Sequence, residues 1–143
     1  GGISGGAKDN EHQALKSFGT NFGMAFQLID DAIDYSSNSK TMGKNIGDDF
    51  KEGKITLPII LAYGRSKNEE KKFLQNVISN PKEDQKNFKL TKELLIKYKC
   101  IEDTLIRANH FADVAIDSLS IFNDNEYKAA LIKLIETSVK RLA

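Results

Sequence analysis

The chain has 143 residues, and its 21 lysines and arginines nearly balance its 20 aspartates and glutamates, which gives a net charge of +1. This length is enough to bury a core, and the even charge excludes the strongly basic face that a nucleic-acid partner would require. The lone cysteine, Cys100, excludes an internal disulfide, and no apolar run is long enough to span a bilayer, so we expect a cytoplasmic protein without a transmembrane segment.

Apolar residues at three- and four-residue spacing predict helices joined by short loops. The first helix is expected over residues 10–35, with Asp9 or Asn10 as N-cap and a glycine-rich loop or cut end before it. A long polar loop follows until Pro58, which suits the first turn of an apolar helix. Further helices are predicted from residue 68 to a turn at 80–81, over 86–99, over 102–120 and from about 124. Alternating strand-like runs are absent, so the predicted fold class is all-α.

The stretch FQLIDDAIDY, residues 26–35, places three aspartates in a segment that otherwise has the pattern of a buried helix. One helical face holds its polar positions and the glycines before them: Gly19, Gly23, Gln27, Asp30, Asp31 and Asp34. Clustered carboxylates near a helix C-terminus are unfavourable, and more so when buried. A divalent cation, best Mg²⁺, would resolve the conflict. A solvated acidic helix end, with the two glycines permitting close helix packing, would give the same pattern.

The loop GKNIGDDFKEGKITLP, residues 43–58, follows the acidic helix end. Its glycines allow the backbone to turn tightly, and its lysines, Lys44 and Lys54, are point charges suited to phosphate. Carboxylates followed by such a loop are what a metal-bound diphosphate requires. A P-loop is excluded, because Ile55 stands where that motif needs Ser or Thr, and no strand precedes the loop.

These two stretches together resemble the second aspartate-rich motif and the following loop of the trans-isoprenyl (polyprenyl) diphosphate synthases, particularly the long-chain octaprenyl-type branch. The C-terminal stretch HFADVAIDSLSIFNDNEYKAALIKLIETSVKR is similar to the last two helices of that family. The resemblance implies the all-α isoprenoid synthase fold, a helical bundle around a central cavity. It also implies a homodimeric prenyltransferase that condenses isopentenyl diphosphate head-to-tail with an allylic prenyl diphosphate, after ionisation assisted by Mg²⁺.

The resemblance carries metal-binding roles to three positions of this sequence. Asp30 matches the aspartate that binds Mg²⁺ most directly. Asp31 and Asp34 match its partners, which often act through metal-bound water.

Substrate-binding roles follow from the same resemblance. Gln27 matches a residue near the reacting carbon that stabilises the cation or guides proton loss. Lys54 matches the lysine that holds the allylic diphosphate, and Lys44 and Asp49 match further loop positions at the substrate.

The sequence departs from the family in one large respect. The family's first aspartate-rich motif and its upstream diphosphate-binding residues do not occur in it. We therefore expect residues 1–143 to be the C-terminal portion of a single isoprenoid synthase domain, and we expect no prenyl transfer by this chain alone.

Related classes fit less well. Terpene cyclases use a second metal motif of Asn, Ser or Thr and Glu at wider spacing, and head-to-head synthases lack the lysine-glycine loop. The alternative function is a noncatalytic helical subunit that stabilises a catalytic partner in a heteromeric prenyl synthase. Such subunits tend to lose the aspartates or the loop lysines, and this sequence retains both.

Overall fold

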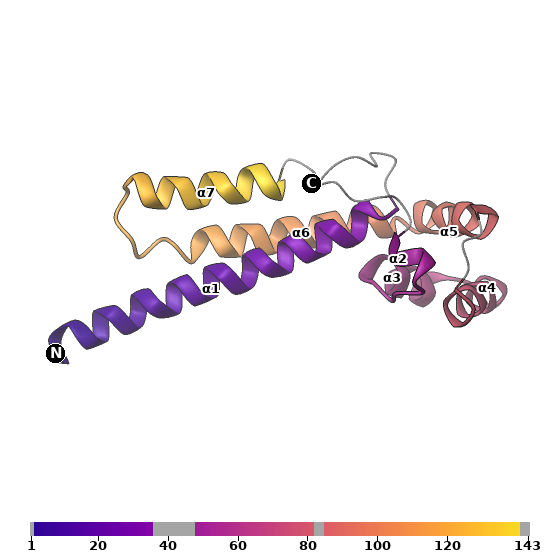
Figure 1. Ribbon diagram of the computed structural model, residues 1–143, viewed down its shortest axis with the longest axis horizontal. Helices are drawn as coiled ribbons and strands as arrows, with labels where there is room; N and C mark the ends of the chain where they lie inside the picture. The colour runs from indigo at the N-terminus through magenta and orange to yellow at the C-terminus, as the bar shows by residue number, and fades with distance from the viewer. Residues whose placement is uncertain (1, 36–47, 82–84, 141–143) are drawn as a thin grey trace. The chain divides into compact units, whose positions relative to one another are not determined.

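The computed structural model describes residues 2–35, 48–81 and 85–140, with side chains from residue 8 onwards. Within these ranges the chain forms helices and turns and no strand, which confirms the all-α prediction. The helices, labelled in Figure 1, are α1 (Gly2–Ile33), α2 (Asp48–Lys51), α3 (Leu57–Arg65), α4 (Asn68–Ser79), α5 (Gln85–Lys97), α6 (Cys100–Asp117) and α7 (Glu126–Ser138). None of the described helices combines the length and the apolarity needed to cross a membrane.

The chain divides into two compact units, each described here by itself. The first unit consists of Gly1–Gln27 and Ile106–Ala143, and the second consists of Leu28–Leu105. The boundaries fall inside α1 and α6, so each of these helices contributes residues to both units.

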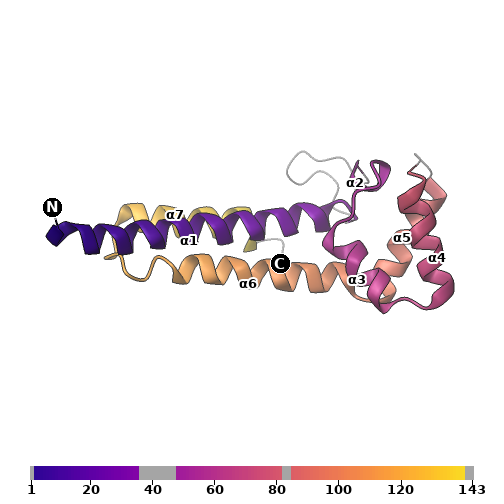
Figure 2. The same ribbon diagram turned by 90° about the horizontal axis from the view of Figure 1, so that it is seen from below.

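In the first unit, α1, α6 and α7 lie side by side, as Figures 1 and 2 show. The α6 positions that face inward are small, and three of them, Ala108, Ala112 and Ala115, are wholly buried. Small side chains at this spacing let helices approach closely. The hydroxyl groups of Ser17 and Ser118 share a hydrogen bond of 2.8 Å, which ties α1 to the turn after α6.

In the second unit, α3, α4 and α5 contact one another around an apolar cluster. The buried members of this cluster are Tyr35, Phe50, Ile59, Ala62, Leu74, Val77, Leu95 and Cys100. Arg65 links three elements, because its guanidinium donates to the carbonyl of Tyr98 and forms an ion pair with Asp103 of α6. Arg65 therefore connects α3 with α6 and with the turn after α5.

Most predicted helices occur close to their predicted bounds, and Pro58 lies in the first turn of α3 as expected. The predicted start of the first helix is wrong, because α1 begins at Gly2 and Asp9 and Asn10 lie inside it. Each glycine lowers helix propensity by only about 1 kcal/mol, and extending an existing helix avoids the cost of nucleation. The short helix α2 was predicted as loop. The first helix was predicted to end at Tyr35, whereas α1 ends at Ile33 and Tyr35 lies in the turn that follows. The first part of the predicted loop falls in residues 36–47, outside the described residues.

Candidate metal centre

Three aspartates mark the end of α1, and they differ in exposure. Asp30 is half-buried, Asp31 is 6% exposed and Asp34 is fully buried. Helix α1 ends at Ile33, so Asp34 lies in the turn that follows rather than on the helical face predicted for it. Burying a carboxylate costs several kcal/mol unless charges or hydrogen-bond donors compensate for the lost water. We therefore describe the interactions of each of these aspartates in turn.

The role of Asp34 is visible in its hydrogen bonds to α2. One carboxylate oxygen accepts from the amide of Asp49 at 2.9 Å, and the other accepts from the amide of Phe50 at 3.2 Å. Amides in the first turn of a helix have no partner within the helix, and an anionic acceptor there is favourable. Asp34 thus joins the one-turn helix α2 to the end of α1.

This junction brings a further carboxylate to the acidic end of α1. Carboxylate oxygens of Asp30, Asp31 and Asp49 all lie within 4.8 Å of one another. The donor set consists of oxygen atoms only, two of its three members are buried, and the three like charges lie close together. Such a set suits a hard divalent cation such as Mg²⁺ or Ca²⁺ rather than a metal that prefers nitrogen or sulfur. The residues present therefore fit the cation that the sequence predicted.

A lysine stands beside this group. The ammonium nitrogen of Lys54 lies 3.7 Å from an Asp49 carboxylate oxygen, and the Lys54 side chain is 45% exposed. The turn that presents it is closed by hydrogen bonds from the Lys54 amide to the Asp49 carbonyl, at 2.9 Å, and from the Gly53 amide to the Phe50 carbonyl, at 3.0 Å. A partly exposed ammonium next to a cation site can bind an anion that also contacts the cation.

Gly53 is needed in this turn for two reasons. Its φ of +68° lies in the left-handed region that residues with a Cβ rarely adopt. A Cβ at this position would also lie 3.1 Å from both the Ile78 carbonyl oxygen and the Pro81 Cβ. The close approach fixes the turn against the end of α4, and with it the position of Lys54.

The phenol of Tyr35 is buried near the charges of three of these aspartates. Burial raises the Tyr35 pKa far above its usual value, and the charges of Asp34, Asp49 and Asp31 raise it further. The hydroxyl is buried and has no hydrogen-bond partner among the described residues. Tyr35 therefore stays neutral at every ordinary pH.

The structure brings together some of the predicted site residues. Asp30, Asp31 and Asp49 form the carboxylate group, and Lys54 lies beside it. Asp49 was predicted to bind substrate, and its place among the candidate metal ligands was missed. Spacing along the chain holds no signal for this place, because it depends on the hydrogen bonds between Asp34 and the amides of α2.

The remaining predicted residues are not among the three grouped carboxylates. Asp34 was predicted as a metal ligand and bonds the amides of α2, although it does not belong to the carboxylate group. Gln27 lies on α1 in the first unit, where it is exposed. Lys44 lies outside the described residues. The catalytic and binding roles assigned to all these residues stay predictions.

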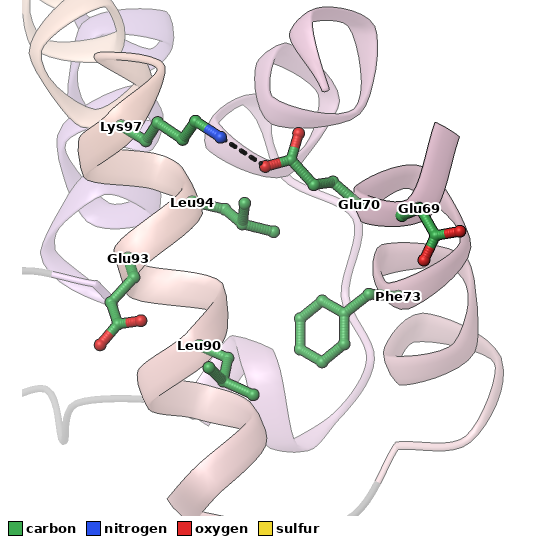
Figure 3. Close-up of a pocket in the computed structure, with 7 residues that line it drawn as sticks. All are labelled: Glu69, Glu70, Phe73, Leu90, Glu93, Leu94 and Lys97. Atoms are coloured by element: carbon green, nitrogen blue, oxygen red, sulfur yellow. Dashed lines mark hydrogen bonds and ion pairs between the residues drawn. The ribbon is translucent and has the colours of Figure 1, made fainter. Parts of the chain in front are cut away.

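A separate groove of about 370 Å³ lies between α4 and α5 (Figure 3). Phe73, Leu90 and Leu94 point toward one another across it, and an ion pair of 2.8 Å between Glu70 and Lys97 crosses its end. Hydrogen bonds from Lys97, Tyr98 and the Lys67 amide lower the Glu70 pKa to about 2. The Glu70 carboxylate is engaged by Lys97 and Tyr98, and the groove does not contain a group of three close carboxylates like the one at the end of α1.

Comparison with known proteins places this geometry in a family. The chain matches the Polyprenyl synthetase family over residues 1–95. It is 36% identical over 139 residues to the octaprenyl diphosphate synthase of Haemophilus influenzae. The aligned region covers 97% of this chain and 42% of that protein.

Solved structures agree with the sequence match. The polyprenyl synthase of Caulobacter crescentus CB15, complexed with calcium and isoprenyl diphosphate, has a TM-score of 0.85 and 40% identity, covering 99% of this chain and 43% of that one. A decaprenyl diphosphate synthase from Rhodobacter capsulatus has a TM-score of 0.86 and 34% identity, covering 99% and 44%.

These matches define the class as all-α proteins with the isoprenoid synthase fold. The chain belongs to the polyprenyl synthetase family, which confirms the resemblance drawn from its motifs. It spans less than half the length of the relatives named above.

Proposed function

We propose that this chain supplies the second aspartate-rich part of the active centre of a polyprenyl diphosphate synthase. The observation that carries the proposal is the group of three carboxylates, Asp30, Asp31 and Asp49, beside Lys54 in a member of this family. The relatives support it. One is named as an octaprenyl diphosphate synthase, and another, a polyprenyl synthase, is complexed with calcium and isoprenyl diphosphate.

The proposed reaction joins an allylic prenyl diphosphate to isopentenyl diphosphate. The carbon–oxygen bond of the allylic substrate breaks and releases diphosphate, a new carbon–carbon bond forms to isopentenyl diphosphate, and a proton leaves the coupled product. The main requirement is stabilisation of the negative charge on the departing diphosphate.

Each residue of the centre has a proposed part in this chemistry. Asp30, Asp31 and Asp49 would hold Mg²⁺, which as a Lewis acid neutralises charge on the diphosphate oxygens. Lys54 binds the diphosphate by charge, and Asp34 keeps α2 in place.

Two further parts rest on motif position alone. Gln27 acts near the reacting carbon, and Lys44 contacts the diphosphate. We also propose that the working assembly is a cytoplasmic homodimer. Two exposed apolar side chains of α1, Met24 and Phe26, are available for such an interface.

The binding part of the proposal is tested with inorganic diphosphate. Diphosphate should raise the melting temperature of this chain only when Mg²⁺ is present, and Asp30→Ala should remove the effect. Stabilisation that persists unchanged in Asp30→Ala would contradict the proposal. In a separate assay with radiolabelled isopentenyl diphosphate, we expect this chain alone to show no prenyl transfer, and turnover would refute that expectation.

A further inference from the structure

Three aromatic rings of the second unit form a contact that spans the two segments carrying the candidate metal ligands. The rings of Tyr35 and Phe88 are stacked, with centroids 5.8 Å apart and planes 25° apart. The rings of Phe50 and Phe88 are tilted by 59°, with centroids 5.2 Å apart. Phe88, on α5, is thus the ring that both of the others touch.

The positions of these rings in the sequence connect them to the carboxylates. Tyr35 directly follows Asp34, at the end of the α1 segment, and Phe50 directly follows Asp49 in α2. Tyr35 is 1% exposed and Phe50 is 4% exposed, so both rings are held inside the apolar cluster. Any shift of Phe50 relative to Tyr35 would shift Asp49 relative to the aspartates of α1.

Helix α2 cannot hold this position by itself. It has four residues, and a single helical turn is far below the length at which helices are stable alone. Among the contacts that fix it are the hydrogen bonds that its amides of Asp49 and Phe50 donate to Asp34, and the packing of Phe50 against Phe88. The hydrogen bonds restrain the backbone, and the aromatic contact restrains rotation of α2 about them.

We propose that Phe88 is a positioning residue for the cation site: its ring clamps Phe50 to Tyr35 and so holds Asp49 beside Asp30 and Asp31. The inference rests on the proposed function, because it assumes that these three carboxylates bind a cation. Cation sites need ligands held within a few tenths of an ångström, so loss of the clamp weakens binding without removing a ligand.

The test compares Phe88→Leu with two controls, all at temperatures well below the melting temperature of each variant. Phe88→Tyr keeps the aromatic ring and should behave like the unmodified chain. Phe73→Leu makes the same change at another half-buried phenylalanine packed on the same cluster, whose ring faces Leu90 and Leu94 (Figure 3). It should cost stability in the same way but leave the clamp intact.

The first readout is hydrogen exchange of the Asp49 and Phe50 amides, which requires no metal. Exchange at both amides should be about threefold to tenfold faster in Phe88→Leu, the size expected for one aromatic contact, and unchanged in Phe73→Leu. Equal exchange in Phe88→Leu and the unmodified chain would show that the Phe88 ring does not hold α2 in place.

The second readout is Mn²⁺ affinity, measured by electron paramagnetic resonance. The dissociation constant should rise about threefold to tenfold in Phe88→Leu only. An unchanged constant would overturn the positioning role. If the unmodified chain failed to bind Mn²⁺, the proposed function would fail instead, and the amide exchange would still decide the clamp.

Discussion

The carboxylate of Asp34 accepts a hydrogen bond of 2.9 Å from the amide of Asp49, a residue fifteen positions further along the chain. Its second oxygen bonds the next amide, that of Phe50. A residue with the sequence position of a metal ligand thus holds the backbone that delivers another candidate ligand. The acidic motif at the end of α1 and the aspartate in α2 form one structural unit.

Removal of this carboxylate should destabilise the fold. Asp34→Ala leaves two buried amides without their acceptor, and each unsatisfied buried donor costs about 1–3 kcal/mol. We expect the free energy of unfolding to fall by about 2–4 kcal/mol, and Asp34→Asn, which keeps one acceptor oxygen, to cost less. Urea unfolding followed by circular dichroism measures both. A loss below about 0.5 kcal/mol for Asp34→Ala would show that the hydrogen bonds between Asp34 and the α2 amides are not needed for stability.

The hydroxyl of Tyr35 gives the opposite expectation. Because it is buried without a hydrogen-bond partner among the described residues, Tyr35→Phe removes an unsatisfied polar group and keeps the ring. The variant should unfold at a higher temperature, by a few degrees for a stabilisation of about 1 kcal/mol. A lower melting temperature would show that the hydroxyl has a partner.

A tyrosine titration tests whether the Tyr35 phenol stays neutral. The chain has four tyrosines, and burial together with three neighbouring carboxylates raises the Tyr35 pKa far above that of an ordinary phenol. In a spectrophotometric titration of the folded chain, Tyr35 should not contribute to the absorbance change at 295 nm near pH 10. Tyr35→Phe should therefore leave that part of the titration curve unchanged, and a lost step near pH 10 would contradict the assignment.

The pair at the end of the groove in Figure 3 should contribute a pH-dependent stability. The Glu70 pKa falls from 4.5 to about 2, chiefly through Lys97, so the folded state binds this proton less tightly than the unfolded state does. The stabilisation is complete above about pH 4.5 and is lost as the pH falls toward 2. Glu70→Gln should lower the melting temperature at pH 7, and this difference should shrink below pH 4.5. Glu69→Gln is the control, and a difference that stayed constant with pH would show that ionisation of Glu70 does not contribute to stability.

Two glycines allow a matched comparison of backbone roles. Gly53→Ala should destabilise by at least about 1 kcal/mol, because the positive φ disfavours a Cβ and the space is occupied. Gly64 lies inside α3, and apart from the adjoining backbone of its own helix no atom of the described residues lies within 4 Å of its Cβ position, so Gly64→Ala should stabilise by up to about 1 kcal/mol. Thermal unfolding distinguishes the two, and equal effects would show that the turn at Gly53 tolerates other residues.

The fold could be predicted wherever local rules act alone. The periodic apolar residues of α3 to α7 and the position of Pro58 are local features, and the helices formed near the expected bounds. Helix α2 could not be found in this way, because its first turn is stabilised by Asp34 from a distant segment. The early start of α1 was missed because glycine propensity is a weak local term.

The candidate site, like the fold, could be predicted only where the signal is local in the sequence. Residues Asp30 and Asp31 follow from helical spacing, and Lys54 follows from the loop motif. The grouping of Asp49 with the aspartates of α1 depends on the tertiary contact through Asp34, which spacing along the chain does not reveal.

We propose that Asp30, Asp31 and Asp49 bind a divalent cation together with diphosphate. Isothermal titration of inorganic diphosphate into the chain, with and without Mg²⁺, tests it most directly when Asp49→Asn is compared with Asp48→Asn. Asp48 is the neighbouring aspartate of α2 and does not belong to the carboxylate group. We expect binding that requires Mg²⁺, is retained in Asp48→Asn and is weakened at least about tenfold in Asp49→Asn. Binding without Mg²⁺, or equal binding by both variants, would contradict it.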